Sequence, residues 1–383
     1  MMEPEIIQRF LESVGQKADV DLYLKLFRAQ KKESFAIISA DAEIVKSALD
    51  PFHFDLRILA GLGLIPIVLL GLEGARDADR QAQRVQEWLL EDAVPARVLG
   101  AGSGTTPEAI DAVRATIADG AIPLLSFEAA KDVNADGRVR MLATLAGSLE
   151  TRKVIFLSRG AGLGPRASPP LSVVNLGLDY EALVSGGALS RRQTTLLRHV
   201  KQLLEQVPHR MSVAVVNPLQ LLRELFTVSG AGTLIRRGSA IETRAGWTDV
   251  DRPRLRALFH SAFGKTLRPD FFETPVERTY IEEGYLGAAI IRETPIAVYL
   301  TKFAVERHAQ GEGIGGELWS MMVRDYPAFF WRARPANPIN SWYGKQCDGM
   351  ARFPEWHVFW RGLPIDRIDP AIRHALGEPT DLV

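Results

Sequence analysis

A chain of 383 residues exceeds the size that one hydrophobic core usually serves, so we expect two domains. Apolar residues make up 46% of the sequence and charged residues 24%, as in an ordinary globular protein. The 46 basic residues balance the 46 acidic residues, so bulk charge gives no reason to expect a nucleic-acid partner or a membrane-surface partner.

Cysteine content and the apolar runs bear on the compartment. The single cysteine, Cys347, cannot form an internal disulfide, which fits a reducing environment. Acidic residues stand near the N-terminus, where a secretory signal would carry basic ones. The most apolar run, 58–72, is too short to span a bilayer and is interrupted by glycine and proline. We therefore expect a cytoplasmic protein without a membrane partner.

The first half of the chain alternates short apolar runs with segments of helical spacing. Helices are expected at 6–14, 22–27, 44–49, 55–62, 107–118 and 138–148, and strands at 35–38, 65–70, 121–125 and 153–157. This alternation indicates an α/β fold with a mostly parallel sheet and helices on its faces.

Several motifs in this half resemble the amino-acid-kinase domain of N-acetylglutamate kinases, in the version fused to an acetyltransferase in N-acetylglutamate synthases and bifunctional synthase/kinases. The resemblance runs from about residue 6 to residue 238 and implies a parallel-sheet sandwich. The segments that carry it are Asp132-Val133-Asn134-Ala135-Asp136, Lys153-Val154-Ile155-Phe156-Leu157-Ser158, Glu224-Leu225-Phe226-Thr227 and Gly232-Thr233-Leu234-Ile235-Arg236-Arg237-Gly238.

Three loops depart from that kinase pattern. The family has Lys-x-Gly-Gly, His-Gly-Gly-Gly and Gly-Gly-Met-x-x-Lys where this chain has 39–42, 70–73 and 186–191. Binding of ATP phosphates needs cations and close backbone N–H groups, and Asp41 in the first loop would repel them. We therefore expect a catalytically inactive kinase-like scaffold over residues 1–235, in which Asn134 and Asp136 serve packing and helix capping.

The second domain is expected over residues 236–383, after a linker of small and then charged residues at 230–238. A helix is expected at 249–263 with Thr248 as its N-cap, followed by strands at 288–291 and 296–305 and a helix at 317–325.

A glycine-rich loop lies between that last strand and helix. Glycines let successive backbone N–H groups point inward, and the following helix adds the positive end of its dipole, which suits the pyrophosphate of coenzyme A. The pattern Q-x-x-G-x-G resembles the acetyl-CoA loop of the GNAT superfamily, while a tight strand-to-helix turn is the alternative. The candidate acetyl-CoA-binding residues are Phe303, Val305, Gln310, Gly311, Gly313, Ile314, Gly315 and Gly316.

The segment 329–345 resembles the W-R-x-R-x-x-N-P-I-N-x-W-Y segment of the vertebrate-type N-acetylglutamate synthase acetyltransferase domain. Two more segments, 263–265 and 299–303, are similar to that domain, and the resemblance covers 237 to about 364. It implies a GNAT α/β acetyltransferase domain that transfers acetyl from acetyl-CoA to L-glutamate, the entry to arginine biosynthesis. The glutamate-binding residues that it implies are Lys265, Lys302, Arg332, Arg334, Asn337, Asn340 and Lys345.

The residue types suit a dicarboxylate acceptor. Arg332 and Arg334 share one face of a strand because side chains alternate with a period of two, and several cations can hold two carboxylates. Lys302, on a neighbouring strand, is a candidate for catalysis as well as binding. Tyr343 is the candidate acid for the leaving thiolate, with a core aromatic as the alternative. Transfer is expected to be direct, with the acetyl carbonyl polarised by a backbone N–H near 303–305.

Other interpretations stay open. The acceptor is another acidic amine in one of them, and in a second the chain is a non-catalytic regulator of a separate acetylglutamate kinase, with which it associates. We expect a homo-oligomer through the kinase-like domain. No cluster of His, Cys and Asp has metal-ligand spacing, so no metal is expected.

Overall fold

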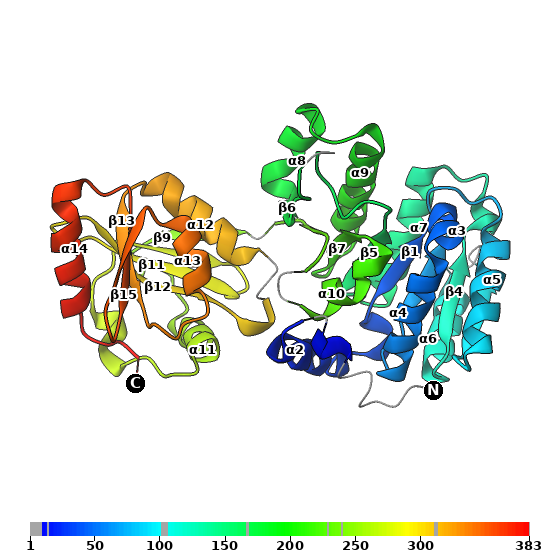
Figure 1. Cartoon of the computed structure of the whole chain (residues 1–383), viewed down its shortest axis with the longest axis horizontal. Helices are drawn as coiled ribbons and strands as arrows, with labels where there is room; N and C mark the ends of the chain where they lie inside the picture. The colour runs from blue at the N-terminus through cyan, green and yellow to red at the C-terminus, as the bar shows by residue number, and fades with distance from the viewer. Residues whose placement is uncertain are drawn as a thin grey trace. The chain divides into compact units, whose positions relative to one another are not determined.

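The computed structural model describes residues 10–13, 15–100, 106–165, 168–227, 230–238, 240–309 and 313–382. The chain divides into two compact units, Met1–Gly238 and Ser239–Val383, each with its own sheet (Figure 1). The sequence placed the domain boundary at 235/236, close to this division.

The described part of the first unit is built on an eight-stranded sheet in the order β3-β4-β2-β1-β5-β7-β8-β6. Its strands are β1 Ile37–Ala40, β2 Ile67–Leu70, β3 Ala96–Gly100, β4 Ile122–Ser126, β5 Lys153–Leu157, β6 Val173–Asn175, β7 Ser212–Val216 and β8 Thr233–Arg236. Every neighbouring pair is parallel except β7 and β8, which are antiparallel. The expected α/β fold with a mostly parallel sheet is therefore confirmed.

Helices cover this sheet on both faces. They are α2 Lys17–Arg28, α3 Ala42–Ser47, α4 Leu49–Gly61, α5 Ala78–Glu91, α6 Pro107–Ala118, α7 Ala135–Ser148, α8 Leu176–Ser185, α9 Arg191–Gln206 and α10 Leu221–Phe226, with 3-10 turns η1 Lys32–Ser34, η3 Glu128–Ala130 and η4 Pro218–Gln220. From β1 through β2 to β3 the chain moves toward one edge of the sheet, and after β3 it moves back toward the other edge. Because parallel crossovers are right-handed, α3, α4 and α5 lie on one face and α6 and α7 on the other.

The structure bears on two expectations from the sequence, the capping role of Asn134 and the linker at 230–238. Asn134 is the N-cap of α7, and its side chain accepts a hydrogen bond from the N–H of Gly137 at 2.8 Å, as expected. The expected linker at 230–238 is wrong in part, because β8 belongs to the sheet and Thr233 is fully buried. Gly232 serves close packing rather than flexibility, since a Cβ there would lie 2.2 Å from the carbonyl oxygen of Val215.

The described part of the second unit carries a seven-stranded sheet in the order β14-β15-β13-β12-β11-β10-β9. Its strands are β9 Ile241–Ala245, β10 Arg278–Glu282, β11 Gly287–Arg292, β12 Val298–Val305, β13 Phe329–Ala333, β14 Gly349–Arg352 and β15 His357–Arg361. Its helices are α11 Arg252–Phe263, α12 Ile314–Asp325, α13 Asn340–Gln346 and α14 Ile365–Gly377, with 3-10 turns η5 Pro269–Glu273 and η6 Arg307–Ala309. The pairing is antiparallel except between β12 and β13.

The two faces of this sheet bury different helices. Side chains of α12 and α13 form one core with alternate residues of β11, β12 and β13. On the other face, α11 packs in one cluster and α14 in another. The N-cap of α11 is Asp251, whose carboxylate accepts the N–H of Arg254 at 3.0 Å, so the prediction of Thr248 is wrong. Asp251 precedes Pro253 in the first turn, where proline is favoured.

No helix formed by the described residues is long and apolar enough to cross a membrane.

Candidate active site

The strands β12 and β13 start as a parallel pair and then separate. Their registered pairs end at Leu300 and Trp331, although β12 continues to Val305. At 301–304, β12 has no strand partner on that side among the described residues. Backbone groups of a buried strand need hydrogen-bond partners, so this stretch of β12 is suited to receive a ligand.

A β-bulge in β12 sets the direction of the side chains at this point. The register with β11 shifts at Thr301, where Ile290 pairs with Lys302 and Ile291 pairs with Leu300. The Thr301 hydroxyl donates to the carbonyl of Ile290 at 3.2 Å, which stabilises the bulge. The extra residue places Leu300 and Phe303 in the core beside α12 and turns Lys302 to the opposite face.

Lys302 is a buried cation with one carboxylate partner. Only 9% of its side chain is exposed, and its Nζ pairs with the carboxylate of Asp381. The ammonium also lies 5.4 Å from the centroid of the Phe271 ring. Burial lowers the pKa of Lys302, and Asp381 offsets part of that effect. An acceptor carboxylate can therefore bind Lys302 only by joining or replacing Asp381.

Arg332 lies on the same face, next to the end of α14. Its guanidinium donates to the carbonyls of Ala375, Glu378 and Pro379 at 2.6, 2.8 and 2.7 Å. These are carbonyls at and beyond the C-terminal end of the helix, which an arginine can satisfy and thereby anchor. Arg332 was predicted to bind substrate. In the structure, its guanidinium N–H groups already donate to backbone carbonyls, so they would have to exchange these partners for a substrate carboxylate.

Arg334 shares a contact with Arg332. Both guanidinium carbons lie 3.9 Å from the centroid of the Trp356 ring, so the two arginines meet at one indole as a shared strand face predicts. Arg334 is exposed and donates to the carbonyl of Glu355 at 3.3 Å, and among the described residues it pairs with the exposed Glu355 carboxylate at 3.4 Å. Its ion pair is weak, so it is the arginine better able to turn to a ligand.

The remaining substrate-binding candidates divide into two kinds. Asn337 and Asn340 order the turn after β13: the Asn337 side chain accepts the N–H of Ile339 at 3.2 Å, and the Asn340 amide donates to the carbonyl of Arg334 at 2.9 Å. Lys265 and Lys345 are exposed on the surface. The asparagines are therefore placed to shape the site, whereas the two lysines extend into solvent.

Tyr343 lies on the opposite face of the sheet from Lys302. Its ring contacts Trp331 at 5.4 Å, Phe359 at 5.5 Å and Phe303 at 6.3 Å between centroids, and its hydroxyl has no hydrogen-bond partner among the described residues. Burial raises the pKa of Tyr343 above that of a free phenol. Both interpretations of Tyr343, as the acid and as a core aromatic, are compatible with this position.

The glycine-rich loop is described only from residue 313, so Gln310 and Gly311 lie outside the described residues. Gly313 is the N-cap of α12 with a φ of 84°, a conformation that favours glycine. Ile314 is fully buried at the start of the helix, and a Cβ on Gly315 would lie 3.4 Å from Val305. Nothing lies within 4 Å of a Cβ built on Gly316. The N-terminus of α12 thus begins beside the end of β12, as an anion cradle requires.

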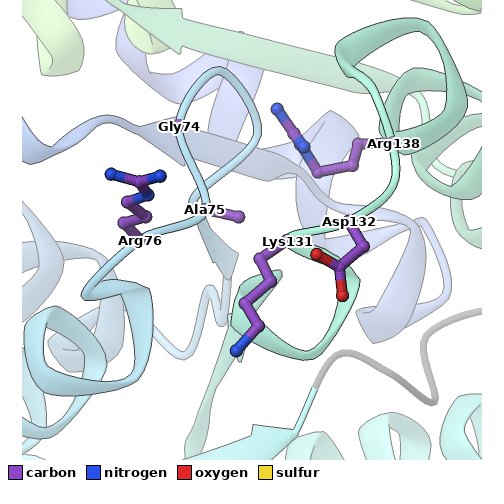
Figure 2. Close-up of a pocket in the computed structure, with 6 residues that line it drawn as sticks. All are labelled: Gly74, Ala75, Arg76, Lys131, Asp132 and Arg138. Carbon is purple, nitrogen blue, oxygen red and sulfur yellow. The ribbon is translucent and has the colours of Figure 1, made fainter.

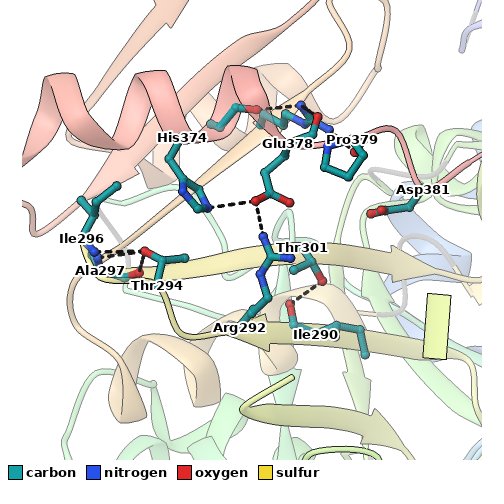
Figure 3. A network of polar contacts seen from close by, with 12 residues as sticks. Ile290, Arg292, Thr294, Ile296, Ala297, Thr301, His374, Glu378, Pro379 and Asp381 are labelled. Carbon is teal, nitrogen blue, oxygen red and sulfur yellow. Dashed lines mark hydrogen bonds and ion pairs between the residues drawn. The ribbon is translucent and has the colours of Figure 1, made fainter. Parts of the chain in front are cut away.

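Sequence reasoning missed the polar side chains that cover the Lys302 face. Figure 3 shows Arg292 on β11, His374 on α14 and Glu378 after it, with Asp381 farther along the tail. Arg292 pairs with Glu378, and Nε2 of His374 lies 3.0 Å from Oε1 of Glu378. No local pattern marks these residues, because the segments that carry them meet only in the folded unit.

In the kinase-like unit, three carboxylates gather where the first two parallel strands end. Arg192 on α9 pairs with Asp41 at 2.5 Å, Glu43 at 3.0 Å and Glu73 at 3.2 Å. The Arg192 hydrogen bond and the nearby Arg159 guanidinium lower the pKa of Glu43. Arg159 also lies 3.7 Å from Glu43, so three carboxylates meet two arginines and net negative charge remains at this edge, which opposes the binding of nucleotide phosphates.

A cavity of about 680 Å³ opens near the same edge of that unit (Figure 2). Its lining residues are Gly74, Ala75, Arg76, Lys131, Asp132 and Arg138. Arg138 is buried and donates to the carbonyls of Leu72 and Glu73 at 2.8 and 3.1 Å, and desolvation lowers its pKa.

The fold and these sites define a class: an amino-acid-kinase-like unit followed by a GNAT-type acetyltransferase unit. Residues 240–377 match the family described as NAT, N-acetyltransferase, of N-acetylglutamate synthase. A mouse mitochondrial N-acetylglutamate synthase is 30% identical over 97% of this chain and 79% of that protein. The chain belongs to the N-acetylglutamate synthase family.

Two further comparisons cover most of the chain. An acetylglutamate kinase from Xylella fastidiosa (strain Temecula1) is 29% identical over 95% of this chain and 99% of that protein. The solved structure of N-acetylglutamate synthase from Neisseria gonorrhoeae, complexed with coenzyme A and N-acetyl-glutamate, has a TM-score of 0.52 at 17% identity, over 90% of this chain and 97% of that one. This likeness confirms the fold, and the family resemblance noted in the sequence is confirmed as well.

Proposed function

We propose that this chain transfers the acetyl group of acetyl-CoA to the α-amine of L-glutamate and forms N-acetyl-L-glutamate and coenzyme A, the entry to arginine biosynthesis. Membership of the family supports the reaction, and the Neisseria relative was solved with coenzyme A and N-acetyl-glutamate. The observation that carries the proposal is the face formed by Lys302, Arg332 and Arg334, where the parallel strands β12 and β13 separate.

The proposed chemistry is a direct transfer. The amine of glutamate attacks the acetyl carbonyl as the free base and forms the carbon–nitrogen bond. The carbon–sulfur bond then breaks, the nitrogen loses one proton and the thiolate of coenzyme A takes up one, so no net proton is released. A backbone N–H of β12 near Phe303 stabilises the negative charge that develops on the carbonyl oxygen. Tyr343 is the candidate donor of the proton to the thiolate. Burial raises the pKa of this phenol, so it is a weaker acid than a free phenol.

We assign the two substrates to the two faces of the β12 edge. The N-terminus of α12 lies next to the core residues Phe303 and Val305. The residues that we propose to bind coenzyme A there are Gly313, Ile314, Gly315 and Gly316, together with Gln310 and Gly311. Lys302 and Arg334 are proposed to bind the carboxylates of glutamate. Arg332, Asn337 and Asn340 hold the surrounding backbone, and Lys265 and Lys345 supply positive charge at the rim.

Free-thiol release from acetyl-CoA tests this proposal. L-glutamate is compared with L-aspartate, ornithine and no acceptor, and Arg334→Ala is compared with wild type. A matched control is Arg373→Ala, which removes an exposed arginine paired with Asp369 on α14. We expect turnover with glutamate that Arg334→Ala weakens and Arg373→Ala leaves unchanged. Turnover with aspartate alone supports another acidic acceptor, and coenzyme A binding without any turnover supports a regulatory role.

We infer that the kinase-like unit has no kinase activity, although relatives of similar identity carry the name acetylglutamate kinase. The carboxylates of Asp41, Glu43 and Glu73 outnumber the two arginines that pair with them at the strand edge, and the loops 39–42 and 70–73 contain no lysine, arginine or histidine to hold a phosphate. Incubation with ATP and N-acetyl-L-glutamate tests this inference. Production of ADP that depends on N-acetyl-L-glutamate would contradict it.

Assembly and compartment are further proposals. We expect a homo-oligomer through the kinase-like unit, since zero formal net charge gives no long-range repulsion between copies. Light scattering of the full chain and of residues 240–383 distinguishes this from assembly through the other unit. Association with an acetylglutamate kinase is a second candidate partner. The cytoplasm is the proposed compartment because the one cysteine fits a reducing environment, whereas the mouse relative is named mitochondrial.

A further inference from the structure

The segment after α14 lies over the face that carries Lys302. This tail, residues 378–382, is held by its backbone as well as by its side chains. The N–H of Arg268 donates to the carbonyl of Asp381 at 3.0 Å, and Leu382 forms an antiparallel bridge with Leu267. Arg332 holds the tail at the other end through the carbonyls of Glu378 and Pro379. The tail therefore has a defined path across the site.

Two carboxylates of the tail point at cations of the sheet. Asp381 pairs with Lys302. Glu378 pairs with Arg292 and lies 3.0 Å from His374 (Figure 3). The Lys302 side chain is 9% exposed and the Glu378 side chain 16%, so both charges are largely removed from water. A buried ammonium without a counter-ion is strongly destabilising, which gives Asp381 a clear physical role in the unliganded unit.

We propose that Asp381 is a tethered competitor for the acceptor's carboxylate. The inference rests on the proposed function, because it takes Lys302 as a ligand of the acceptor carboxylate. L-glutamate carries two carboxylates, and the tail presents the same chemical group to the same ammonium. The acceptor must displace Asp381 to reach Lys302, and the tail remains anchored through Glu378 while Asp381 and Leu382 move away.

This arrangement predicts how the tail affects kinetics. A competitor on the same chain acts at an effective concentration in the millimolar range or above. If the tail-bound form is favoured about tenfold, the apparent KM for the acceptor is about tenfold above its intrinsic value. Amines without a carboxylate cannot replace Asp381, so the tail also selects against such acceptors. The start of α12 at 313–316 lies on the other side of the sheet, so we expect acetyl-CoA binding to be unaffected.

The test removes the competing charge in two ways. Asp381→Asn keeps the shape of the side chain. A chain that ends at Glu378 lacks the part of the tail that carries Asp381 but keeps the ion pair between Glu378 and Arg292. Asp369→Asn is the control, since Asp369 is an exposed carboxylate that pairs with Arg373 at 2.7 Å. We expect the KM for L-glutamate to fall roughly three- to tenfold in both variants with the KM for acetyl-CoA changed little, while the melting temperature falls because Lys302 loses its counter-ion.

A structural role for Asp381 gives the opposite result. If Asp381 only stabilises the site, Asp381→Asn raises the KM for glutamate, and that result overturns the proposal whatever the change in melting temperature. An unchanged KM overturns it as well.

A binding measurement keeps this outcome separate from the proposed function. Titration calorimetry with glutarate, a dicarboxylate without an amine, reports competition at Lys302 without turnover. Tighter glutarate binding by Asp381→Asn supports the proposal even if glutamate is not acetylated, and equal or weaker binding contradicts it.

Discussion

A buried carboxyl group in the kinase-like unit gives a prediction whose size follows from the structure. Asp55 lies on α4 with 7% of its surface exposed, and its Oδ2 is buried without a hydrogen-bond partner among the described residues. Desolvation raises the pKa of Asp55 from 3.8 to about 8. Between about pH 4 and pH 8, the folded protein therefore keeps a proton on Asp55 that the unfolded chain has already lost.

The free energy of unfolding falls as the pH rises, because the folded state binds the extra proton on Asp55. The stability that this group contributes is fully present below pH 4 and is lost as the pH rises toward 8. The slope is about 1.4 kcal/mol per pH unit, and the full loss is at most about 6 kcal/mol. Asp55→Asn cannot titrate, so its free energy of unfolding loses this slope, while any fixed penalty from the amide is independent of pH.

Urea unfolding of the full chain at pH 5, 6.5 and 8, followed by circular dichroism, measures this difference. We expect the gap in unfolding free energy between Asp55→Asn and wild type to shift in favour of the variant by about 1 kcal/mol or more per pH unit. Asp50→Asn, an exposed carboxylate on the same helix, should show no such shift. A constant gap across this pH range would refute the reasoning that Asp55 is protonated in the folded state.

Three further changes have defined outcomes. Tyr343→Phe, if the hydroxyl protonates the thiolate, lowers kcat about 100-fold with little change in KM, and an unchanged kcat in a stopped assay leaves Tyr343 as a core aromatic. Gly232→Ala places a Cβ 2.2 Å from a backbone oxygen and should lower the unfolding free energy by about 2 kcal/mol or more in urea. Lys153→Met leaves Glu224, which is 4% exposed and 2.8 Å from Lys153 Nζ, buried without its cation; a loss of about 3 kcal/mol is expected, and thermal unfolding near that of wild type would contradict it.

Local signals were sufficient for the regular elements of the fold. The apolar run at β5 and the Thr106-Pro107 start of α6 mark elements whose limits the structure reproduces, because each is bounded by residues that end or cap it. The N-cap of α11 was misplaced because both Thr248 and Asp251 can cap a helix. Only Pro253 in the first turn distinguishes them, and that signal was available in the sequence.

Glycines show where sequence alone is ambiguous. Gly232 suits a flexible linker or a close backbone approach equally well, and only the neighbouring strand β7 decides for the approach. The strand period of two correctly predicted that Arg332 and Arg334 share a face, since both stack on Trp356. The alternation of side chains along a strand could not show that the Arg332 guanidinium donates to three backbone carbonyls.

The partners of Lys302 could not be predicted. Asp381 is 79 residues away in the chain, and its contact depends on the path of α14 and the tail across the sheet. A lone acidic residue near a chain end has no local signature of such a role. Burial of Lys302 likewise depends on the bulge at Thr301, which adds one residue to β12 and reverses the direction of the side chains.

The central claim is that the Lys302 face binds the carboxylates of L-glutamate for acetyl transfer. Its most direct test is the KM for glutamate in Lys302→Met, measured by thiol release from acetyl-CoA, with the KM for acetyl-CoA and the melting temperature as internal controls. We predict that the KM for glutamate rises about 30-fold or more, as for the loss of a charge-assisted hydrogen bond, while the KM for acetyl-CoA stays near that of wild type. Glutamate turnover with an unchanged KM in a folded Lys302→Met variant would contradict the claim.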